Sequence, residues 1–259
     1  MKKNAITLFL LLTCSWIAAY GWGKVGHDAT AYIAECHLTP TAKANIEKYL
    51  GGKSIVYYAS WLDKVSRMPE YKSISKGHTY SVDENGQYAP RKGGDAIAVI
   101  NRQIELLKNY KELPDSVVAT GIKVLVHSIG DMHCPAHTVY PDRSQNFYFK
   151  VFDKPYRFHQ FWDGTSLEGN HKWYYTDYQY QLDRCTPEQR NALSQGTPEE
   201  WAAENARNCN EIYQWTLPDT DMNKAQSLAL MLKVEELADS QILKGSYRLA
   251  RILNELFDK

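Results

Sequence analysis

The sequence has no excess of either charge: among its 259 residues, 30 are Lys or Arg and 30 are Asp or Glu. A chain without net charge does not hold a polyanion through a global field, so any contact with nucleic acid must come from a local site. Beyond its first segment the chain also lacks a long apolar run, which predicts no membrane anchor. Internal repeats and low-complexity linkers are absent too, and the length then favours one sizeable domain.

Thiolate zinc motifs are missing as well, because none of the five cysteines has Cys-x-x-Cys spacing. Four cysteines remain after the first segment, and they allow three pairings. These are Cys36, Cys134, Cys185 and Cys209. We expect a Cys185–Cys209 disulfide, because these two lie closest together in sequence and flank a helix-rich segment.

The first segment has the features of a cleavable secretion signal. Lys2 and Lys3 precede an apolar run over 6–12, and Ala19 and Gly21 put small residues where a signal peptidase cuts. We therefore predict a signal peptide over 1–21 and a secreted or periplasmic mature chain over 22–259.

Cleavage after Gly21 would give Trp22 a free α-amine. This amine and the Trp22 carbonyl oxygen would form a five-membered chelate, and the His27 imidazole could close on the same ion. A lipoprotein with Cys14 as the lipidated residue is the less favoured alternative, because Thr13 is larger than the residue usually found there.

Helical signals dominate the rest of the chain. Threonine before proline marks three helix starts, at 39–40, 186–187 and 197–198, the latter two with a capping-box partner three residues on. Apolar residues recur at helical spacing in 97–107, 117–129 and 228–256, the last with a break near Gly245. The best strand candidate is 147–151, and 72–94 is irregular. The sequence thus predicts an all-α, single-domain, multi-helix fold.

Histidine and aspartate recur at metal-ligand spacing. His127 and Asp131 are four residues apart, so on a helix they share a face and can bind one ion. Pro135 then disturbs the helix and lets His137 point elsewhere. A lone pair of this kind is more often a hydrogen-bonded pair than a metal site, with about one chance in ten of ligation.

Several such motifs together favour a metal site over separate hydrogen-bonded pairs. A second His-x-x-x-Asp pair follows at His159 and Asp163, and Asp63 and His78 lie upstream. The nitrogen and carboxylate set is typical of zinc and suits three Zn²⁺ ions with open positions. The predicted metal ligands are Trp22, His27, Asp63, His78, His127, Asp131, His137, His159 and Asp163.

With these motifs the chain resembles the S1/P1 nuclease family, zinc-dependent single-strand nucleases and 3′-nucleotidases related in fold to bacterial zinc phospholipase C. The resemblance runs through Trp22-Gly23 with Gly26-His27, Ser60-Trp61-Leu62-Asp63, His78, His127-x-x-Gly130-Asp131-x-x-x-Pro135-x-His137, His159-x-x-Trp162-Asp163 and the helical 244–254. It implies a phospholipase C/P1 nuclease-like fold over 22–259 with a trinuclear zinc cleft.

The resemblance also implies how the ligands divide. Asp63, His78, His127 and Asp131 would hold one zinc; Trp22, His27 and the bridging Asp131 would hold its neighbour; and His137, His159 and Asp163 would hold the third. A metal-bridged hydroxide would then hydrolyse single-stranded DNA or RNA, and 3′-nucleotides, to products with 5′ phosphates. The substrate would be the only partner of a monomer without stable protein partners.

The catalytic candidates are Asp63, Asp131 and Arg67. The family has an arginine three residues after the aspartate that matches Asp63; here that position is Ser66, and Arg67 follows it. Arg67 could still reach the site from the same helical face, or be a surface residue.

Substrate-binding candidates are Tyr80, Asp83 and Asn146. Tyr80 could stack a base or be a packed core residue. Asp83 could accept hydrogen bonds from a base or hold a turn, and Asn146 lies in a string that departs from the family's.

Cys134 also departs from the family's pattern, and it could pair with Cys36 or stay reduced and buried; metal ligation is the less favoured option. His133 is interpreted as structural, and His37 and His171 have no predicted role.

Two other functions compete. One is a phospholipase C-type phosphodiesterase that acts on lipid headgroups; the five-residue step from Trp22 to His27 and the aspartate at Asp163 favour the nuclease pattern over it. The other is an exported zinc-binding protein without hydrolytic activity.

Overall fold

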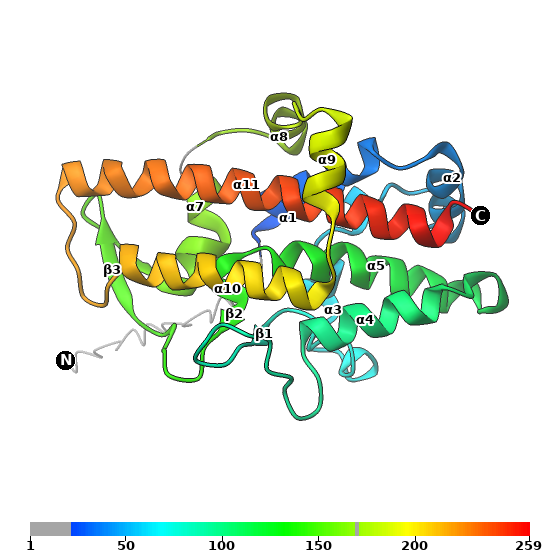
Figure 1. Ribbon diagram of the computed structural model, residues 1–259, viewed down its shortest axis with the longest axis horizontal. Coiled ribbons are helices and arrows are strands. Elements are labelled where there is room, and N and C mark those ends of the chain that lie inside the picture. The colour runs from blue at the N-terminus through cyan, green and yellow to red at the C-terminus, as the bar shows by residue number, and fades with distance from the viewer. Residues whose placement is uncertain (1–21, 169–170) are drawn as a thin grey trace, which may run out of the picture.

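The computed structural model describes residues 22–168 and 171–259, and helices dominate it, which confirms the predicted all-α class (Figure 1). The predicted signal peptide and its cleavage site lie outside the described residues. The α-helices are α1 (Lys24–Cys36), α2 (Pro40–Tyr49), α3 (Trp61–Val65), α4 (Ala96–Leu107), α5 (Asp115–Met132), α6 (Phe158–Gln160), α7 (Ser166–Glu168), α8 (Tyr175–Leu182), α9 (Pro187–Ser194), α10 (Pro198–Trp215) and α11 (Lys224–Phe257).

Short helices and strands complete the chain. The 3₁₀-helices are η1 (Ile55–Tyr58), η2 (Pro69–Tyr71), η3 (Tyr110–Glu112) and η4 (Pro135–His137), and η5 (Phe161–Thr165) is a π-helix. The strands are β1 (Tyr80–Ser81), β2 (Thr138–Val139), β3 (Tyr148–Val151) and β4 (Lys154–Arg157). β1 pairs in parallel with β2, and β3 pairs antiparallel with β4, which confirms a strand close to the predicted 147–151.

The predicted helix starts are confirmed. The Thr39 side chain accepts a hydrogen bond from the Ala42 amide, and α2 then begins at Pro40. Thr186 and Thr197 each form a capping box, at the starts of α9 and α10. Each device satisfies amides that the first helical turn leaves without a partner.

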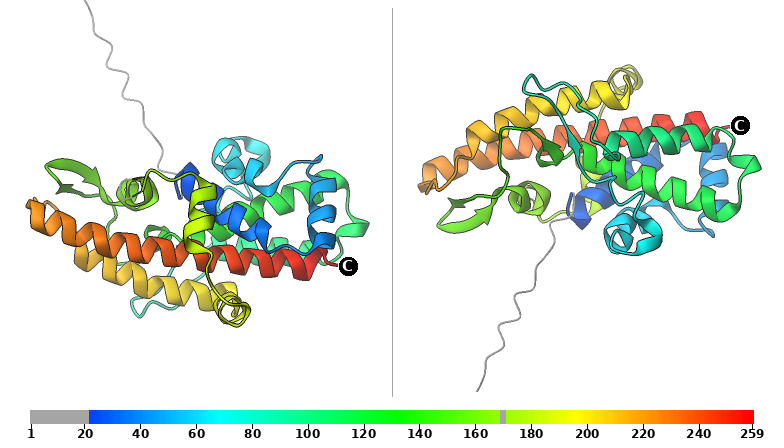
Figure 2. Two further views of the ribbon diagram at one scale, coloured as in Figure 1. Left: turned by 90° about the horizontal axis from the view of Figure 1, so that it is seen from above. Right: turned by 90° about the horizontal axis from the view of Figure 1, so that it is seen from below.

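The longest helix differs from its prediction. α11 continues without a break for 34 residues and runs along most of the molecule (Figures 1 and 2). The expected break at Gly245 is wrong because this glycine serves packing: a Cβ there would lie 3.2 Å from Cγ of His133. α11 packs against α1, α5 and α9.

Helix α5 carries two of the predicted ligands, His127 and Asp131, between two core clusters. Ile129 and Met132 of α5 belong to the first cluster, while Cys134 and Ala136, just beyond its end, belong to the second. Pro135 begins η4 directly after α5, as predicted, because proline cannot continue the helix. The burial of twelve α5 residues fixes the side chains of its last three turns.

The expected disulfide is wrong in this structure: the four cysteines of the described chain are all unpaired. Cys209 is buried on α10, where its thiol donates to the Thr138 carbonyl oxygen at 3.5 Å. The thiol thus already has a partner inside the core, which proximity in sequence does not reveal.

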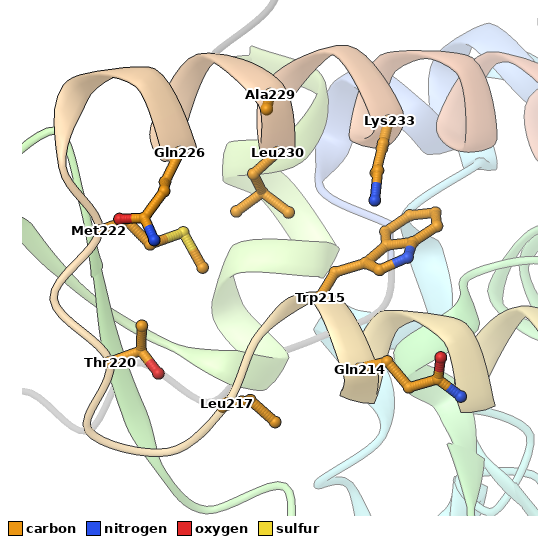
Figure 3. Close-up of a pocket in the computed structure, with 9 residues that line it drawn as sticks. All are labelled: Gln214, Trp215, Leu217, Thr220, Met222, Gln226, Ala229, Leu230 and Lys233. Atoms are coloured by element: carbon orange, nitrogen blue, oxygen red, sulfur yellow. The ribbon is translucent and has the colours of Figure 1, made fainter.

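None of the helices in the described part of the chain is long and apolar enough to cross a membrane. A pocket of about 340 Å³ lies between the end of α10 and the start of α11 (Figure 3). It is lined by apolar residues, amides, Thr220 and Lys233, and none of its nine labelled residues is a predicted ligand.

Candidate metal centre

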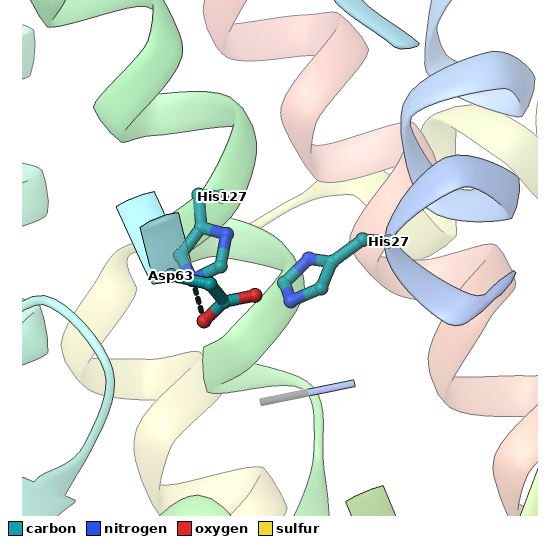
Figure 4. A group of neighbouring side chains, drawn as sticks. All are labelled: His27, Asp63 and His127. Atoms are coloured by element: carbon teal, nitrogen blue, oxygen red, sulfur yellow. Dashed lines mark ion pairs between the residues drawn. The ribbon is translucent and has the colours of Figure 1, made fainter. Parts of the chain in front are cut away.

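The fold brings the eight predicted His and Asp ligands into two adjoining groups. His27 comes from α1, Asp63 from α3 and His127 from α5, and their side chains converge (Figure 4). The remaining ligands are His78 before β1, Asp131 on α5, His137 in η4, His159 on α6 and Asp163 in η5.

Asp131 lies at the centre of the first group and is completely buried. Its Oδ2 lies 2.8 Å from Nδ1 of His78 and 3.0 Å from Nε2 of His127, and its Oδ1 lies 3.1 Å from Nε2 of His27. Oδ1 of Asp63 approaches Nε2 of His127 at 3.5 Å. One carboxylate therefore faces three imidazoles, as a bridging ligand would.

Asp163 organises the second group. Its Oδ1 lies 3.1 Å from Nε2 of His137, and its Oδ2 lies 3.2 Å from Nε2 of His159. The two imidazole rings stack with centroids 5.1 Å apart. Asp163 is in a π-helix, a local geometry often found at functional sites.

Several polar atoms in these groups are buried without a hydrogen-bond partner among the described residues: both ring nitrogens of His27, Oδ1 of Asp63, Oδ1 of Asp131 and Oδ2 of Asp163. Nε2 of His27 is within 3.1 Å of Asp131 but is not aligned for a hydrogen bond. An unsatisfied buried polar atom costs about 1–3 kcal/mol. These nitrogen and oxygen atoms point toward one another but are not joined by hydrogen bonds, an arrangement that a divalent cation would satisfy. Nitrogen and oxygen ligands suit zinc.

Neighbouring oxygens orient three of the histidines. Nδ1 of His127 donates to the Ala59 carbonyl oxygen at 2.8 Å, and Nδ1 of His137 donates to that of His78 at 2.5 Å. Nδ1 of His159 bonds to Oε1 of Gln145 at 2.8 Å. Each bond fixes the ring tautomer and turns Nε2 toward an aspartate, as the outer partners of metal-binding histidines do.

The pKa values reflect this charge arrangement. Burial opposes charge on every group, but Asp131 and Asp163 still raise the pKa of His137 to about 9. In return, His127, His137 and His27 lower the pKa of Asp131 well below its ordinary value, despite its burial. Burial and the neighbouring His127 lower the pKa of His27. Asp131 and Asp163 are thus ionised, and metal binding must displace a proton from His137.

Trp22 is held against the second group. Its side chain is buried, and the Gly23 amide donates to the Asp163 carbonyl oxygen. A Cβ on Gly26 would lie 2.9 Å from Cβ of Trp22 and 2.7 Å from Leu167, so this position requires glycine. Ligation by the Trp22 amine stays a prediction, because the preceding residues lie outside the described chain.

The predicted stacking role of Tyr80 is wrong. Its side chain has 0% exposure, and its hydroxyl accepts hydrogen bonds from Thr138 at 2.7 Å and Asn205 at 3.2 Å. Burial by residues distant in sequence leaves no ring face for a base. The alternative of a packed tyrosine is confirmed.

The other substrate candidates have different outcomes. Oδ1 of Asp83 accepts from the amides of Asn85 and Gln87, which confirms the turn role that the sequence left open. Asn146 is exposed and accepts a hydrogen bond from Arg157, and its binding role stays a prediction.

Arg67 is exposed in a turn beyond the end of α3 at Val65, so it does not share a helical face with Asp63 as expected. Its catalytic role stays a prediction.

Cys134 is reduced and buried, with its thiol 3.6 Å from Oδ1 of Asp163. Burial and the Asp163 charge raise its pKa well above the ordinary value, so it is a protonated donor to the carboxylate. His133 is structural as expected: it bonds to the Ile129 carbonyl oxygen and to Arg248.

Sequence reasoning missed two features. Gln145 orients His159 and also donates to the Thr138 carbonyl oxygen, and only its position in the string 144–146 hinted at a role. A further group with metal-ligand spacing, His171, Glu235 and Asp239, lies apart from the predicted ligands. Its signal was an acidic pair four residues apart on a helix.

The comparisons agree with a helical protein that carries clustered His and Asp ligands. The sequence model of the S1/P1 nuclease family matches residues 22–258, so the chain belongs to that family. It is 27% identical to nuclease S1 of Aspergillus oryzae over 163 residues, 58% of this chain and 55% of that protein. It is 28% identical to nuclease P1 of Penicillium citrinum over 131 residues, 45% of this chain and 47% of that protein.

The matched part thus spans about half the length of these two relatives. A match to endonuclease 4 of Arabidopsis thaliana covers more, 96% of this chain and 93% of that protein, at 22% identity.

Proposed function

We propose that the protein is an exported, zinc-dependent phosphodiesterase that hydrolyses single-stranded DNA or RNA, and 3′-nucleotides, to products with 5′ phosphates. The observation that carries this proposal is the convergence of buried, unsatisfied His and Asp atoms on two adjoining points. Membership of the S1/P1 nuclease family gives the centre its expected chemistry.

Three zinc ions would be held as the resemblance implies: by Asp63, His78, His127 and Asp131; by Trp22, His27 and Asp131; and by His137, His159 and Asp163. When bound, they would supply Lewis acidity toward a phosphate oxygen and lower the pKa of water near neutral pH. Asp131 would hold two of the binding points together.

The chain's own residues would fix this geometry. The Ala59 and His78 carbonyl oxygens and Gln145 hold the rings of His127, His137 and His159 in one orientation, so little reorganisation is needed when substrate arrives. Cys134 donates to Asp163 and steadies its carboxylate. We further propose that the enzyme works as a monomer without a membrane anchor.

The test is to measure product release by purified mature protein from single-stranded DNA, RNA, a 3′-nucleotide and phosphatidylcholine, together with zinc content. We expect 5′-nucleotides, about three zincs per chain, and loss of turnover with a chelator. Release from phosphatidylcholine alone would favour the phospholipase alternative, and bound zinc without any turnover would favour a binding protein.

His127→Ala and His37→Ala form a matched pair. Both histidines face an aspartate, but His37 bonds to Asp183, outside the candidate centre. Only His127→Ala should lose zinc and activity. Equal losses in both variants would contradict the assignment of the centre.

A further inference from the structure

A second cavity is lined by residues of α1 and α3, the helices that also carry His27 and Asp63. It is a groove of about 780 Å³ between α1, the segment from Ser54 to Lys64, and α8. Five aromatic residues line it, Tyr32, Tyr57, Tyr58, Trp61 and Tyr175. We call it the aromatic groove.

The aromatic groove is built from the same elements as the centre. Lys24, Asp28 and Tyr32 recur every four residues and therefore form one face of α1. His27 precedes Asp28 by one position, about 100° around the helix, where it faces the centre. On α3, Asp63 lies between the groove residues Ser60 and Lys64, three positions after the first and one before the second. A phosphate at the centre would thus have its neighbouring nucleotides beside this groove.

The groove offers ring faces paired with cations. Tyr57 is 67% exposed and meets Tyr58 edge to face, with centroids 4.9 Å apart. The Lys53 ammonium lies 5.5 Å from the ring centroid of Tyr57, and that of Lys123 lies 4.3 Å from the centroid of Tyr58. Tyr57 is the exposed ring of the five and the others are partly buried. An exposed ring beside lysines is a combination that binds unpaired nucleotides without reading their sequence.

Charge in and around the groove suits a polyanion. Its two carboxylates are paired, Asp28 with Lys24, and Glu35 with Lys43 at 2.9 Å. Lys53, Lys64 and Lys123 add positive charge at or beside the rings. The lining has two lysines and two carboxylates, so the positive charge that a polyanion would meet comes from Lys64 and from Lys53 and Lys123 beside the rings.

The pocket between α10 and α11 lacks this combination. The pocket in Figure 3 has one aromatic ring, Trp215, with the Lys233 ammonium 5.3 Å from its centroid. Leu217, Met222 and Leu230 form much of the remaining wall. A single ring beside apolar walls does not offer successive stacking faces.

We propose that the aromatic groove binds the unpaired nucleotides that neighbour the scissile phosphate, with a base on the exposed face of Tyr57 and phosphates near the lysines. This proposal rests on the proposed nuclease function. It makes chain length a determinant of affinity, because a strand long enough to reach Tyr57 gains a contact that a dinucleotide at the centre does not.

The deciding variant is Tyr57→Ala, and Tyr180→Ala is its matched control. Tyr180 is 64% exposed, and the Arg184 guanidinium lies 4.5 Å from its ring centroid, but Tyr180 does not line the groove. Loss of one stacked base should weaken binding about 5- to 150-fold. KM for single-stranded oligodeoxythymidine should rise by that factor in Tyr57→Ala alone, while kcat/KM for a dinucleotide stays unchanged.

Two further variants test the chemistry. Tyr57→Phe keeps the ring and should restore most of the affinity, and Lys53→Gln should reduce the salt dependence of oligomer binding by about one unit of slope. Equal effects of Tyr57→Ala and Tyr180→Ala, or equal losses on oligomer and dinucleotide, would overturn the proposal.

Equilibrium binding separates this proposal from the proposed function. Fluorescence anisotropy of a labelled oligodeoxythymidine with linkages that resist hydrolysis, measured on the zinc-loaded protein, needs no turnover. If turnover fails on every substrate but Tyr57→Ala still weakens binding, only the nuclease function fails. If turnover succeeds and Tyr57→Ala leaves oligomer binding unchanged, the aromatic groove is not a strand site.

Discussion

His133 and His137 are both buried just beyond α5, yet opposite charges surround them. The ring of His133 lies between the Ile129 carbonyl oxygen at 2.7 Å and the Arg248 guanidinium at 2.8 Å, and burial and Arg248 lower its pKa to about 3. The ring of His137 faces Asp163, and the carboxylates raise its pKa to about 9.

The difference shows what separates a structural histidine from a candidate ligand. The cation next to His133 is a protein side chain, the guanidinium of Arg248, and its charge is balanced by an ion pair with Glu204. Around His137 the protein supplies anions, and one buried oxygen of each carboxylate, Oδ1 of Asp131 and Oδ2 of Asp163, lacks a hydrogen-bond partner among the described residues. Burial alone therefore does not identify a metal ligand, whereas unbalanced negative charge does.

The largest expected effect comes from Asp131→Asn, which removes the charge shared by the first group. We expect zinc loss and a fall in kcat/KM of more than about 100-fold, since even outer partners of metal ligands are worth about 10- to 100-fold. His137→Ala should cost less, because it removes a ligand of one ion only. Equal, mild losses in the two variants would contradict the bridging role.

The next effect concerns Trp22. One residue added before it should replace the α-amine by an amide, lower the zinc content toward two ions per chain and reduce activity by about 10- to 100-fold. A residue added after Lys259, at the exposed other end, is the control. Intact mass and metal analysis check both proteins, and full activity with unchanged zinc in the first would rule out the amine as a ligand.

A smaller effect is expected on the His133 side, at Glu204. Despite its partial burial, hydrogen bonds from Lys244 and Arg248 lower its pKa from 4.5 to about 2. Because the folded-state pKa is lowered, this stabilisation is fully present above pH 4.5 and is lost as the pH falls through about 2.

Glu204→Gln should therefore lower the free energy of unfolding by about 2–4 kcal/mol at neutral pH, and less toward the acid end. Denaturant titrations across the acid range measure the difference. Zinc content should stay unchanged, and a loss of zinc would show that the two regions are coupled.

The smallest effect is expected for Tyr80→Phe. Loss of the hydroxyl removes the hydrogen bonds with Thr138 and Asn205 and should cost about 1–2 kcal/mol of stability. KM for single-stranded substrate should not change, because the ring is buried. A raised KM at unchanged stability would restore Tyr80 as a binding residue.

Local signals made much of the fold predictable. Thr186 and Thr197 each form a capping box with a partner three residues later, so a short stretch of sequence contains every residue of the motif. Gly245 could not be interpreted from its local sequence. A glycine is needed there because the ring of His133, more than a hundred residues earlier in the chain, packs against it. The thiol of Cys209 likewise has its partner at Thr138.

The candidate site divides in the same way. His127 and Asp131 could be placed together because a helix turn joins them, and the resemblance supplied the order of the other ligands. The burial of Tyr80 could not be foreseen, because Asn205 of α10 contributes to it. The aromatic groove could not be predicted either, because its contacts join elements distant in sequence: Lys123 of α5 lies over rings from η1 and α3.

The unbroken α11 has a consequence for how the protein loses its structure. Its buried apolar residues from Leu230 to Tyr247 pack in one core cluster, and those from Leu249 to Phe257 pack in the other. Both clusters contain residues of α11, so unfolding of one cluster would disrupt the packing of the other. We therefore expect one cooperative transition on heating. The ligands on α5 lie between the clusters and should therefore keep their spacing until the whole domain gives way.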